Sequence, residues 1–311
     1  MRLIFLGTGG SLPTPKRNVS AIAVHMGSEL LLFDCGEGTQ RQFMLSSASF
    51  MKVTSIFITH LHGDHFLGLP AMIQSMSFSG RTRPLYVHGP EGMEEAMRSM
   101  LALGYFKPSF HVMTMEVEEG DEIEFPGFKV MPIEADHTVP AFAYVIQEDP
   151  RPGKFNLDKA KGLGLPEGPL FSRLQGGEAV EVGGRTITPD MVLGPKRRGR
   201  KVLISGDTRP SKEIIEAGNG ADLIVHEATL HSSLGQEAAE YGHSTAAEAA
   251  EVAKQAGAKL LCLYHFSNRY DDAQVLLDEA RAIFPNTILA EDLSSLQVNP
   301  PEEEWNRQAK G

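Results

Sequence analysis

The first 150 residues alternate between short apolar runs and longer amphipathic stretches. The apolar runs are rich in β-branched and aliphatic residues and end at Gly, Asn or polar clusters, a pattern typical of β-strands. In the longer stretches Met, Leu and Ala recur at spacings of three and four, which predicts helices. The predicted strands are 2–6, 21–24, 30–33, 53–58, 85–87, 123–125, 128–133 and 142–146, and the predicted helices are about 37–46, 66–78 and 91–103.

The same alternation returns after residue 201. It predicts strands at 202–205, 223–226, 260–264 and 287–290, and helices at 212–217, 246–255 and 273–284. Thr245, followed three residues later by Glu248, forms a capping-box pattern at the start of the middle helix. Because strands and helices recur at similar spacing in both halves, we expect an α/β fold in which two sheets face each other as a layered sandwich.

Residues 150–201 interrupt this pattern. They contain 10 Gly and 6 Pro, about twice the density of the whole chain, so we expect a flexible insertion without a compact core. The segment also carries 11 Lys and Arg against 5 Asp and Glu, a local charge of +6. Two interpretations remain open: a solvated insertion whose charge has no role, or an arm that binds a polyanion.

The whole chain is acidic, because 29 Lys and Arg against 40 Asp and Glu give a formal charge of -11, which leaves -17 outside the insertion. Such a field repels phosphate at long range and argues against non-specific coating of nucleic acid or membrane. Only two cysteines, Cys35 and Cys262, occur in the 311 residues, which argues against a disulfide framework or a thiolate metal site. Apolar runs are too short for a signal peptide or a membrane span, so we expect a cytoplasmic protein.

Three histidines and an aspartate are concentrated directly after the predicted strand 53–58, in the segment Thr59-His60-Leu61-His62-Gly63-Asp64-His65. Buried imidazole nitrogens each need a hydrogen bond or a cation, and a divalent metal is a partner that several of them can share. In a turning segment, His60 and His62 can point to one side while Asp64 and His65 reach a second point. The spacing therefore predicts two metal ions.

Three later residues are candidate ligands because each follows an apolar strand: His137, Asp207 and His265. Loops at strand ends are where a rigid scaffold brings such side chains together. Imidazole and carboxylate ligands without a thiolate favour Zn²⁺, with Mn²⁺, Fe²⁺ and Co²⁺ as poorer alternatives. Two such ions about 3.5–4 Å apart can activate water and stabilise the attacking and leaving oxygens of a phosphodiester, so hydrolysis is the predicted reaction class.

In the order of these motifs the chain resembles the metallo-β-lactamase fold superfamily, over residues 1 to about 295. The resemblance implies a four-layer αββα sandwich in one catalytic domain, 1–311, with the insertion at 150–201 and a C-terminal tail at 296–311. It also implies two zinc ions, one held by His60, His62 and His137, the other by Asp64, His65 and His265, with Asp207 bridging them. Asp34, at the end of the strand 30–33, is implied as a hydrogen-bonding support for a ligand.

Narrower motifs resemble the ribonuclease Z family, whose members process the 3′ end of transfer RNA. The N-terminal loop, Gly7-Thr8-Gly9-Gly10 and Pro13-Thr14-Pro15-Lys16-Arg17-Asn18, is similar to the family's loop, although many members carry a basic residue where Pro15 stands. His226-Glu227-Ala228-Thr229 and His243-Ser244-Thr245 resemble two further family motifs, and the basic insertion resembles the family's substrate-binding arm. The resemblance implies substrate contacts by Lys16, Arg17, Asn18, Gly168, Pro169, Lys196, Arg197 and Arg198.

The resemblance also implies three catalytic roles. Asp64 is implied as the general base, although a carboxylate bound to a cation is a weak base, so orienting the nucleophile is the alternative role. His243 is implied as the proton donor to the departing 3′ oxygen, with Glu227 fixing its tautomer. From the residues alone, His243 could equally be a histidine at a helix start, because it precedes the capping box.

The expected function is zinc-dependent removal of the 3′ trailer from precursor transfer RNA. Cleavage after the discriminator base leaves a 3′ hydroxyl on the transfer RNA and a 5′ phosphate on the trailer. Expected partners are precursor transfer RNA and a second copy of the chain, but not DNA or a membrane. The alternatives are a metal-dependent phosphodiesterase or a lactone or thioester hydrolase acting on small molecules, and a non-catalytic RNA-binding relative, which a complete ligand set disfavours.

Overall fold

The computed structural model describes residues 1–301 of the chain. These residues divide into two compact units: the first comprises Met1–Gln147 and Arg200–Asn299, and the second contains Glu148–Gly199. Both bounds of the second unit lie two residues before the corresponding bounds of the predicted insertion, 150–201. No helix among the described residues is both long enough and apolar enough to cross a bilayer.

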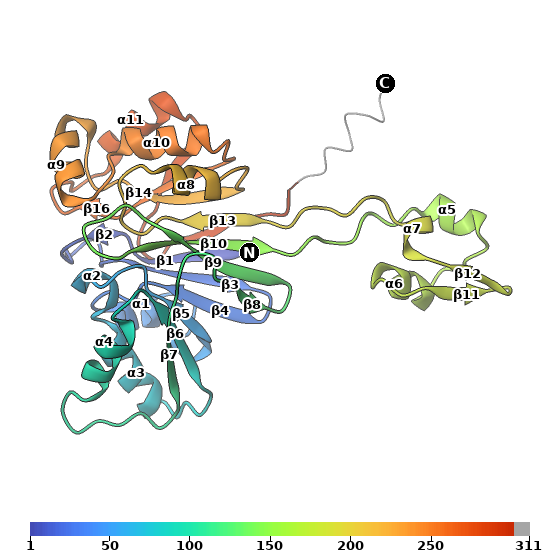
Figure 1. Cartoon of the computed structure of the whole chain (residues 1–311), viewed down its shortest axis with the longest axis horizontal. Helices are drawn as coiled ribbons and strands as arrows, with labels where there is room; N and C mark the ends of the chain where they lie inside the picture. The colour runs from blue at the N-terminus through green and yellow to red at the C-terminus, as the bar shows by residue number, and fades with distance from the viewer. Residues whose placement is uncertain (302–311) are drawn as a thin grey trace. The chain divides into compact units, whose positions relative to one another are not determined.

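The first unit contains two seven-stranded sheets (Figure 1). The first sheet has the order β18-β1-β3-β4-β5-β6-β7, and its strands from β4 to β7 are parallel. Its strands are β1 (Arg2–Gly7), β3 (Ala21–Met26), β4 (Glu29–Phe33), β5 (Ser55–Phe57), β6 (Leu85–Gly89), β7 (Val112–Glu116) and β18 (Ser295–Gln297). Strands β7 and β18 were not predicted from the sequence.

The second sheet has the order β17-β15-β14-β13-β10-β9-β8, with β13, β14, β15 and β17 parallel. Its strands are β8 (Ile123–Phe125), β9 (Phe128–Glu134), β10 (Phe142–Glu148), β13 (Lys201–Ile204), β14 (Leu223–Glu227), β15 (Leu261–Tyr264) and β17 (Thr287–Leu289). A separate two-stranded pair joins β2 (Gly9–Gly10) to β16 (Phe266–Ser267).

Alternating side chains in the strands produce four layers. Phe33 and Val225 point into the core between the two sheets, whereas their neighbours Leu32 and Ile224 face the outer helices. The first sheet is covered by α1 (Thr39–Leu45), α3 (Leu69–Phe78) and α4 (Met93–Leu101), and the second by α8 (Lys212–Ala217), α10 (Ala246–Gln255) and α11 (Gln274–Ile283) (Figure 1). The predicted αββα sandwich is confirmed, as is the capping box of α10.

The C-terminal end of the described chain differs from the prediction of a tail at 296–311. Leu296 pairs with Leu3 and Gln297 pairs with Arg2 in β18, and Val298 is buried. The prediction failed because three residues are too few for their alternation to register as a strand. Residues 302–311, which include Trp305, lie outside the described part of the chain.

The insertion contains short helices, a hairpin and a small core, so the expectation that it lacks a compact core was wrong. It contains α5 (Leu157–Gly162), α6 (Pro169–Gln175), the hairpin β11 (Val180–Val182) and β12 (Arg185–Ile187), and α7 (Pro189–Val192). These short elements enclose a small core of Ala160, Leu165, Leu174, Val180, Ile187 and Val192. The rings of Phe155 and Phe171 lie 4.5 Å apart between centroids and pack against that core. Gly and Pro therefore join short elements here instead of preventing a fold.

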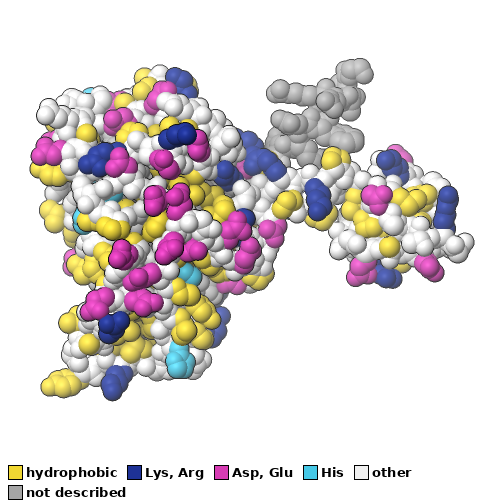
Figure 2. Space-filling model, viewed as in Figure 1, with side chains coloured by type: hydrophobic (Ala, Val, Ile, Leu, Met, Phe, Trp, Pro, Cys, Tyr) yellow, Lys and Arg dark blue, Asp and Glu magenta, His cyan; other side chains and the backbone are white. Residues whose placement is uncertain are grey.

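The charge of the insertion is concentrated at its two ends. Between Gly153 and Pro195 the charges cancel, with basic Lys154, Lys159, Lys161, Arg173 and Arg185 against acidic Asp158, Glu167, Glu178, Glu181 and Asp190. The excess of +6 in residues 150–201 is therefore carried by Arg151, Lys196, Arg197, Arg198, Arg200 and Lys201. Figure 2 shows Asp and Glu side chains gathered over the visible face of the first unit, and both signs of charge on the second.

Candidate active site

The candidate site lies at the carboxyl ends of the central strands of both sheets. Asp34 follows β4, and the segment from His60 to His65 follows β5 and includes the short helix α2 (Gly63–Phe66). Asp207 follows β13 and His265 follows β15. Parallel strands end at the same edge of a sheet, so residues far apart in the sequence converge where the two edges meet.

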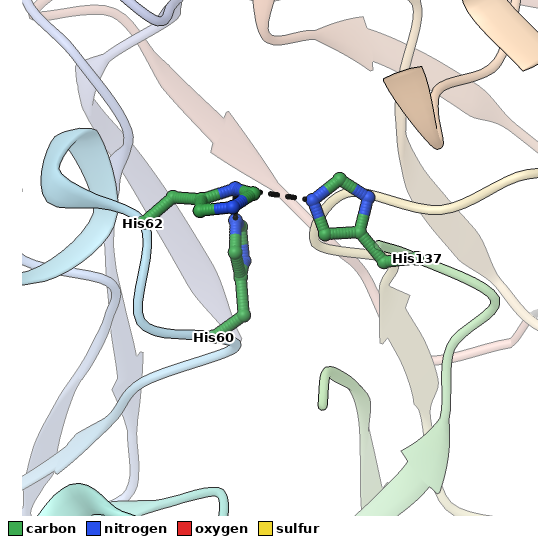
Figure 3. A group of neighbouring side chains, drawn as sticks. All are labelled: His60, His62 and His137. Atoms are coloured by element: carbon green, nitrogen blue, oxygen red, sulfur yellow. Dashed lines mark hydrogen bonds between the residues drawn. The ribbon is translucent and has the colours of Figure 1, made fainter. Parts of the chain in front are cut away.

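His60, His62 and His137 form the first cluster (Figure 3). Nδ1 of His62 lies 3.1 Å from Nε2 of His60 and 3.2 Å from Nε2 of His137. Nδ1 of His137 donates a hydrogen bond of 2.7 Å to the carbonyl oxygen of Gly242, which leaves the lone pair of Nε2 facing the cluster. Burial lowers the pKa of His60, so its ring is neutral and can act as a ligand.

Asp64, His65 and His265 form the second cluster. Nε2 of His65 lies 3.2 Å from Nε2 of His265, and Oδ2 of Asp64 lies 3.5 and 3.4 Å from those two atoms. On its other side, Nδ1 of His65 is 2.7 Å from Oδ2 of Asp34, the residue that the resemblance implies as a support for a ligand. Asp34 is itself held by the backbone N–H of Thr59, at 2.8 Å.

Asp207 lies between the two clusters. Its Oδ2 atom is 3.7 Å from Nε2 of His60 and 3.4 Å from Nε2 of His65. Burial alone would raise the pKa of Asp207, but the neighbouring His265 and His65 lower it, so the carboxylate is ionised. Although Asp207 is buried, its Oδ1 atom has no hydrogen-bond partner among the described residues.

The arrangement of donor atoms fits divalent metal ions. Tetrahedral Zn²⁺ with Zn–N bonds of about 2.0–2.1 Å separates its ligand nitrogens by about 3.3–3.4 Å. The nitrogen pairs in both clusters are separated by 3.1–3.2 Å, close to that spacing. A metal would also satisfy Oδ1 of Asp207, which is buried, accepts no hydrogen bond from the described residues and lies 3.3 Å from Nδ1 of His265. The site therefore has the donor set for divalent metal, and these residues are the ones that would hold it.

His243 and Glu227 form an ion pair beside the clusters. Nδ1 of His243 is 3.0 Å from Oε1 of the buried Glu227 and 3.7 Å from Oδ2 of Asp207. Burial would lower the pKa of His243, but the Glu227 carboxylate outweighs that effect and raises the pKa to about 9. Thr229 also donates to Glu227, at 2.6 Å, and so fixes the carboxylate. His243 is therefore a cation at neutral pH.

The N-terminal loop closes over the second cluster. The backbone N–H of Ser11 donates to Oδ2 of Asp64 at 2.7 Å. A Cβ atom on Gly10 would lie 2.7 Å from Cε1 of His265, so only glycine lets the loop pass this close to the imidazole. The sequence did not indicate this contact between Ser11 and Asp64, because the N-terminal loop and the histidine motif are 53 residues apart.

The three predicted substrate contacts of this loop make contacts within the first unit. Lys16 is exposed and forms an ion pair of 3.7 Å with Asp271. The guanidinium of Arg17 donates to the carbonyl of Tyr270 and lies 5.0 Å from the centroid of the Phe266 ring. Asn18 donates to the carbonyl of Glu37 at 2.9 Å. The structure places the remaining predicted contacts, Gly168, Pro169, Lys196, Arg197 and Arg198, in the second unit.

Known proteins resemble this chain over nearly its full length. Ribonuclease Z of Methanosarcina acetivorans is 47% identical over 299 residues, which are 96% of this chain and 98% of that protein. Ribonuclease Z of Archaeoglobus fulgidus is 49% identical over 300 residues, or 96% and 97% of the two chains. A family described as anti-Pycsar protein Apyc1 matches residues 1–147, which is less than half of the chain.

Solved structures also match this chain over nearly its full length. The crystal structure of human tRNase Z, short form, has a TM-score of 0.70 and 29% identity, covering 96% of this chain and 100% of that one. The metallo-β-lactamase fold protein YhfI from Bacillus subtilis has a TM-score of 0.69 and 18% identity, with 95% and 98% covered. The two-sheet αββα architecture thus defines a protein of the metallo-β-lactamase fold, with paired His/Asp clusters at its candidate site. Within that fold, its close relatives show that the chain belongs to the ribonuclease Z family.

Proposed function

We propose that this chain is a zinc-dependent endoribonuclease that removes the 3′ trailer from precursor transfer RNA. It cuts after the discriminator base and leaves a 3′ hydroxyl on the transfer RNA and a 5′ phosphate on the trailer. The observation that supports this most is the complete set of seven donor residues beside the His243–Glu227 pair, in a member of the ribonuclease Z family. Two Zn²⁺ ions, replaceable by Mn²⁺, would activate water and stabilise charge on the scissile phosphate.

The ligand residues have distinct tasks in this proposal. His60, His62 and His137 would hold one ion and Asp64, His65 and His265 the other, and Asp207, which lies between the two clusters, would contribute to both. Asp64 orients the attacking water and accepts its proton. The N–H of Ser11 already donates to Oδ2 of Asp64, and this hydrogen bond restricts the carboxylate to one orientation.

His243 is proposed as the proton donor to the departing 3′ oxygen. Its Nδ1–H donates to Glu227, so the proton on Nε2 is the one available for transfer. The raised pKa of His243 means that the acid form is populated at neutral pH. Both oxygens of Glu227 also accept hydrogen bonds from Thr208 and Thr229, which hold the carboxylate against His243.

Recognition of the substrate is proposed to involve both units. Lys16, Arg17 and Asn18 contact the acceptor end of the RNA. Gly168 and Pro169 at the start of α6, with Lys196, Arg197 and Arg198 near the end of the insertion, contact the body of the transfer RNA. Their positive charges would attract phosphate over a short range despite the acidic first unit.

A homodimer is the proposed assembly, and a cytoplasmic location is proposed with it. Helices α1 and α3 pack against one another and expose large apolar side chains: Met44 is 65% exposed, Leu45 53% and Phe78 80%. Large exposed apolar side chains on two packed helices are typical of a surface that another protein covers. Sedimentation of the wild type and Phe78→Glu at equal concentration tests this, because a monomeric wild type would exclude the dimer.

The proposed reaction is tested with a precursor transfer RNA that carries a labelled 3′ trailer. Wild type, His65→Ala and a deletion of residues 151–198 are compared with Zn²⁺ or Mn²⁺ present. We expect trailer release by the wild type, none by His65→Ala, and a large rise in KM for the deletion. A wild type that releases no trailer while hydrolysing bis(p-nitrophenyl) phosphate would instead support the alternative, a small-molecule phosphodiesterase.

A further inference from the structure

Three loops of the candidate site are joined through the short segment that follows Asp207. The hydroxyl of Thr208 accepts a hydrogen bond from the backbone N–H of Asp136, the residue before His137, at 3.1 Å. The carbonyl of Thr208 accepts one from the hydroxyl of Ser244, the residue after His243, at 2.6 Å. The segment therefore connects the loop of a proposed metal ligand with the loop of the proposed proton donor.

Arg209 extends these connections with its side chain. Its Nε–H donates to the carbonyl oxygen of Ala239 at 2.6 Å, and an amino group of its guanidinium lies 2.9 Å from Oδ1 of Asp136. Its backbone N–H donates to the carbonyl of Asp136 at 2.8 Å. One side chain thus holds two loops at once, and 28% of its surface remains exposed.

Ala239 lies in the last turn of α9 (Gly235–Tyr241), four residues before His243. The chain leaves this helix at Gly242, which has a φ of 79°, and the backbone N–H of His243 donates back to the carbonyl of Ala238 at 2.8 Å. A cation at the C-terminal carbonyls of a helix is favourable, and a charged hydrogen bond is stronger than a neutral one. Arg209 is therefore well placed to fix the end of α9 and the backbone that leads from it to His243.

We propose that Arg209 is a positioning residue for the cleavage reaction: its guanidinium, held between Asp136 and Ala239, sets the position of His243 relative to Asp207. This inference rests on the proposed role of His243 as proton donor. The planar guanidinium donates in two fixed directions, which a lysine ammonium cannot reproduce. Arg209 acts through His243 and need not touch the RNA.

The test compares Arg209→Met, Arg209→Lys and a matched control, Arg281→Met. Arg281 lies in the last turn of α11, and its Nε also donates to a backbone carbonyl, that of Thr287. Trailer release is measured under single-turnover conditions, with KM and metal content determined for each variant. We expect Arg209→Met to lower the cleavage rate at least about tenfold, with KM and metal content within about twofold of wild type. The cleavage rate of Arg209→Lys should lie between those of Arg209→Met and the wild type, and Arg281→Met should cleave at the wild-type rate.

A double-mutant cycle separates the positioning role from other roles. In a His243→Ala background, Arg209→Met should lower the rate by less than about twofold further, because the group that it positions is gone. An equal loss in both backgrounds would overturn the positioning role, and so would a rise in KM without a slower cleavage rate, or loss of metal. If His243→Ala alone cleaves at the wild-type rate, the proposed proton donor is wrong, a result that is visible without any Arg209 variant.

Discussion

Replacing Glu227 with Gln should move the pH dependence of cleavage, because this carboxylate sets the charge of His243. Oε1 of Glu227 lies 3.0 Å from Nδ1 of His243, and the carboxylate raises the pKa of His243 from 6.5 to about 9. Glutamine has nearly the same shape but no charge. The substitution therefore removes the largest cause of the raised pKa while leaving the imidazole in place.

The size of the effect follows from the two pKa values. A proton donor is active below its pKa, so the wild-type rate should hold through neutral pH and fall as the pH rises through about 9. With the ordinary pKa of 6.5, the protonated fraction at pH 7.5 falls from about 97% to about 9%, a loss of about tenfold. In this variant the nearby Asp207 carboxylate still raises the pKa of His243 while burial lowers it, so a loss of about tenfold is the expected size. The deficit should shrink as the pH is lowered towards 6.

The assay is single-turnover trailer release between pH 6 and 9.5, because excess enzyme reports the cleavage step and not product release. Glu279→Gln is the matched control, since Glu279 also pairs with a histidine, His231, at 3.2 Å and also accepts backbone N–H groups. Thermal melting and metal content are measured alongside, because the amide of Glu227→Gln places one N–H against the backbone N–H groups of Thr208 or Thr229.

Any of three results would refute this reasoning. A loss in Glu227→Gln that is the same at every pH would show that Glu227 does not act through the charge of His243. An equal shift in Glu279→Gln would show that the shift reflects a general change in the protein. A folded Glu227→Gln variant with wild-type metal content and an unshifted profile would exclude His243 as the titrating acid.

Three further predictions concern the metals and the insertion. Gly242→Ala should weaken metal binding on the order of tenfold in a chelator competition, because the added Cβ would lie 2.6 Å from Nδ1 of His137. The control is Gly220→Ala, which is also at positive φ but in open space and should bind metal like the wild type. Metal removal by a chelator should abolish trailer release, and added Zn²⁺ or Mn²⁺ should restore it. Trailer release by metal-free protein would contradict the proposal that cleavage needs metal at the two clusters. Raising salt from about 50 to 200 mM should reduce cleavage of precursor transfer RNA by the full chain much more than by the 151–198 deletion; equal salt dependence would exclude phosphate contacts by the insertion.

The residues of the two clusters could be predicted from the sequence as neighbours in the fold, because they occupy the turns that follow strands. His60, Asp207 and His265 follow apolar runs whose ends are easy to locate, and the parallel order of the strands brings these ends together. Their spacing in the sequence thus carries most of the information about their place in the fold. Their proposed catalytic roles stay predictions.

The supporting residues could not be predicted in the same way. Thr229, Gly242 and Arg209 act through contacts with atoms that are distant in the sequence, and neither their residue types nor their neighbours identify those partners. Helix α9 was also missed, since its residues Gly235–Tyr241 offer mainly Ala and polar side chains and no stripe of large apolar residues. Its position depends on contacts such as that between Ala239 and Arg209, which exist only in the folded protein.

The positions of the charges in the insertion determine which parts of it can attract RNA in the proposed function. A segment with a uniform +6 would attract phosphate wherever it touched, but the folded part between Gly153 and Pro195 has no net charge. Long-range attraction must therefore come from the ends, above all from the run Lys196 to Lys201. Within the folded part, the proposed recognition would depend on shape and hydrogen bonds, which discriminate one RNA fold from another better than charge does. We therefore expect charge removal at Lys196 and Arg198 to change the salt dependence of binding, and changes at Gly168 and Pro169 to alter which RNAs are accepted.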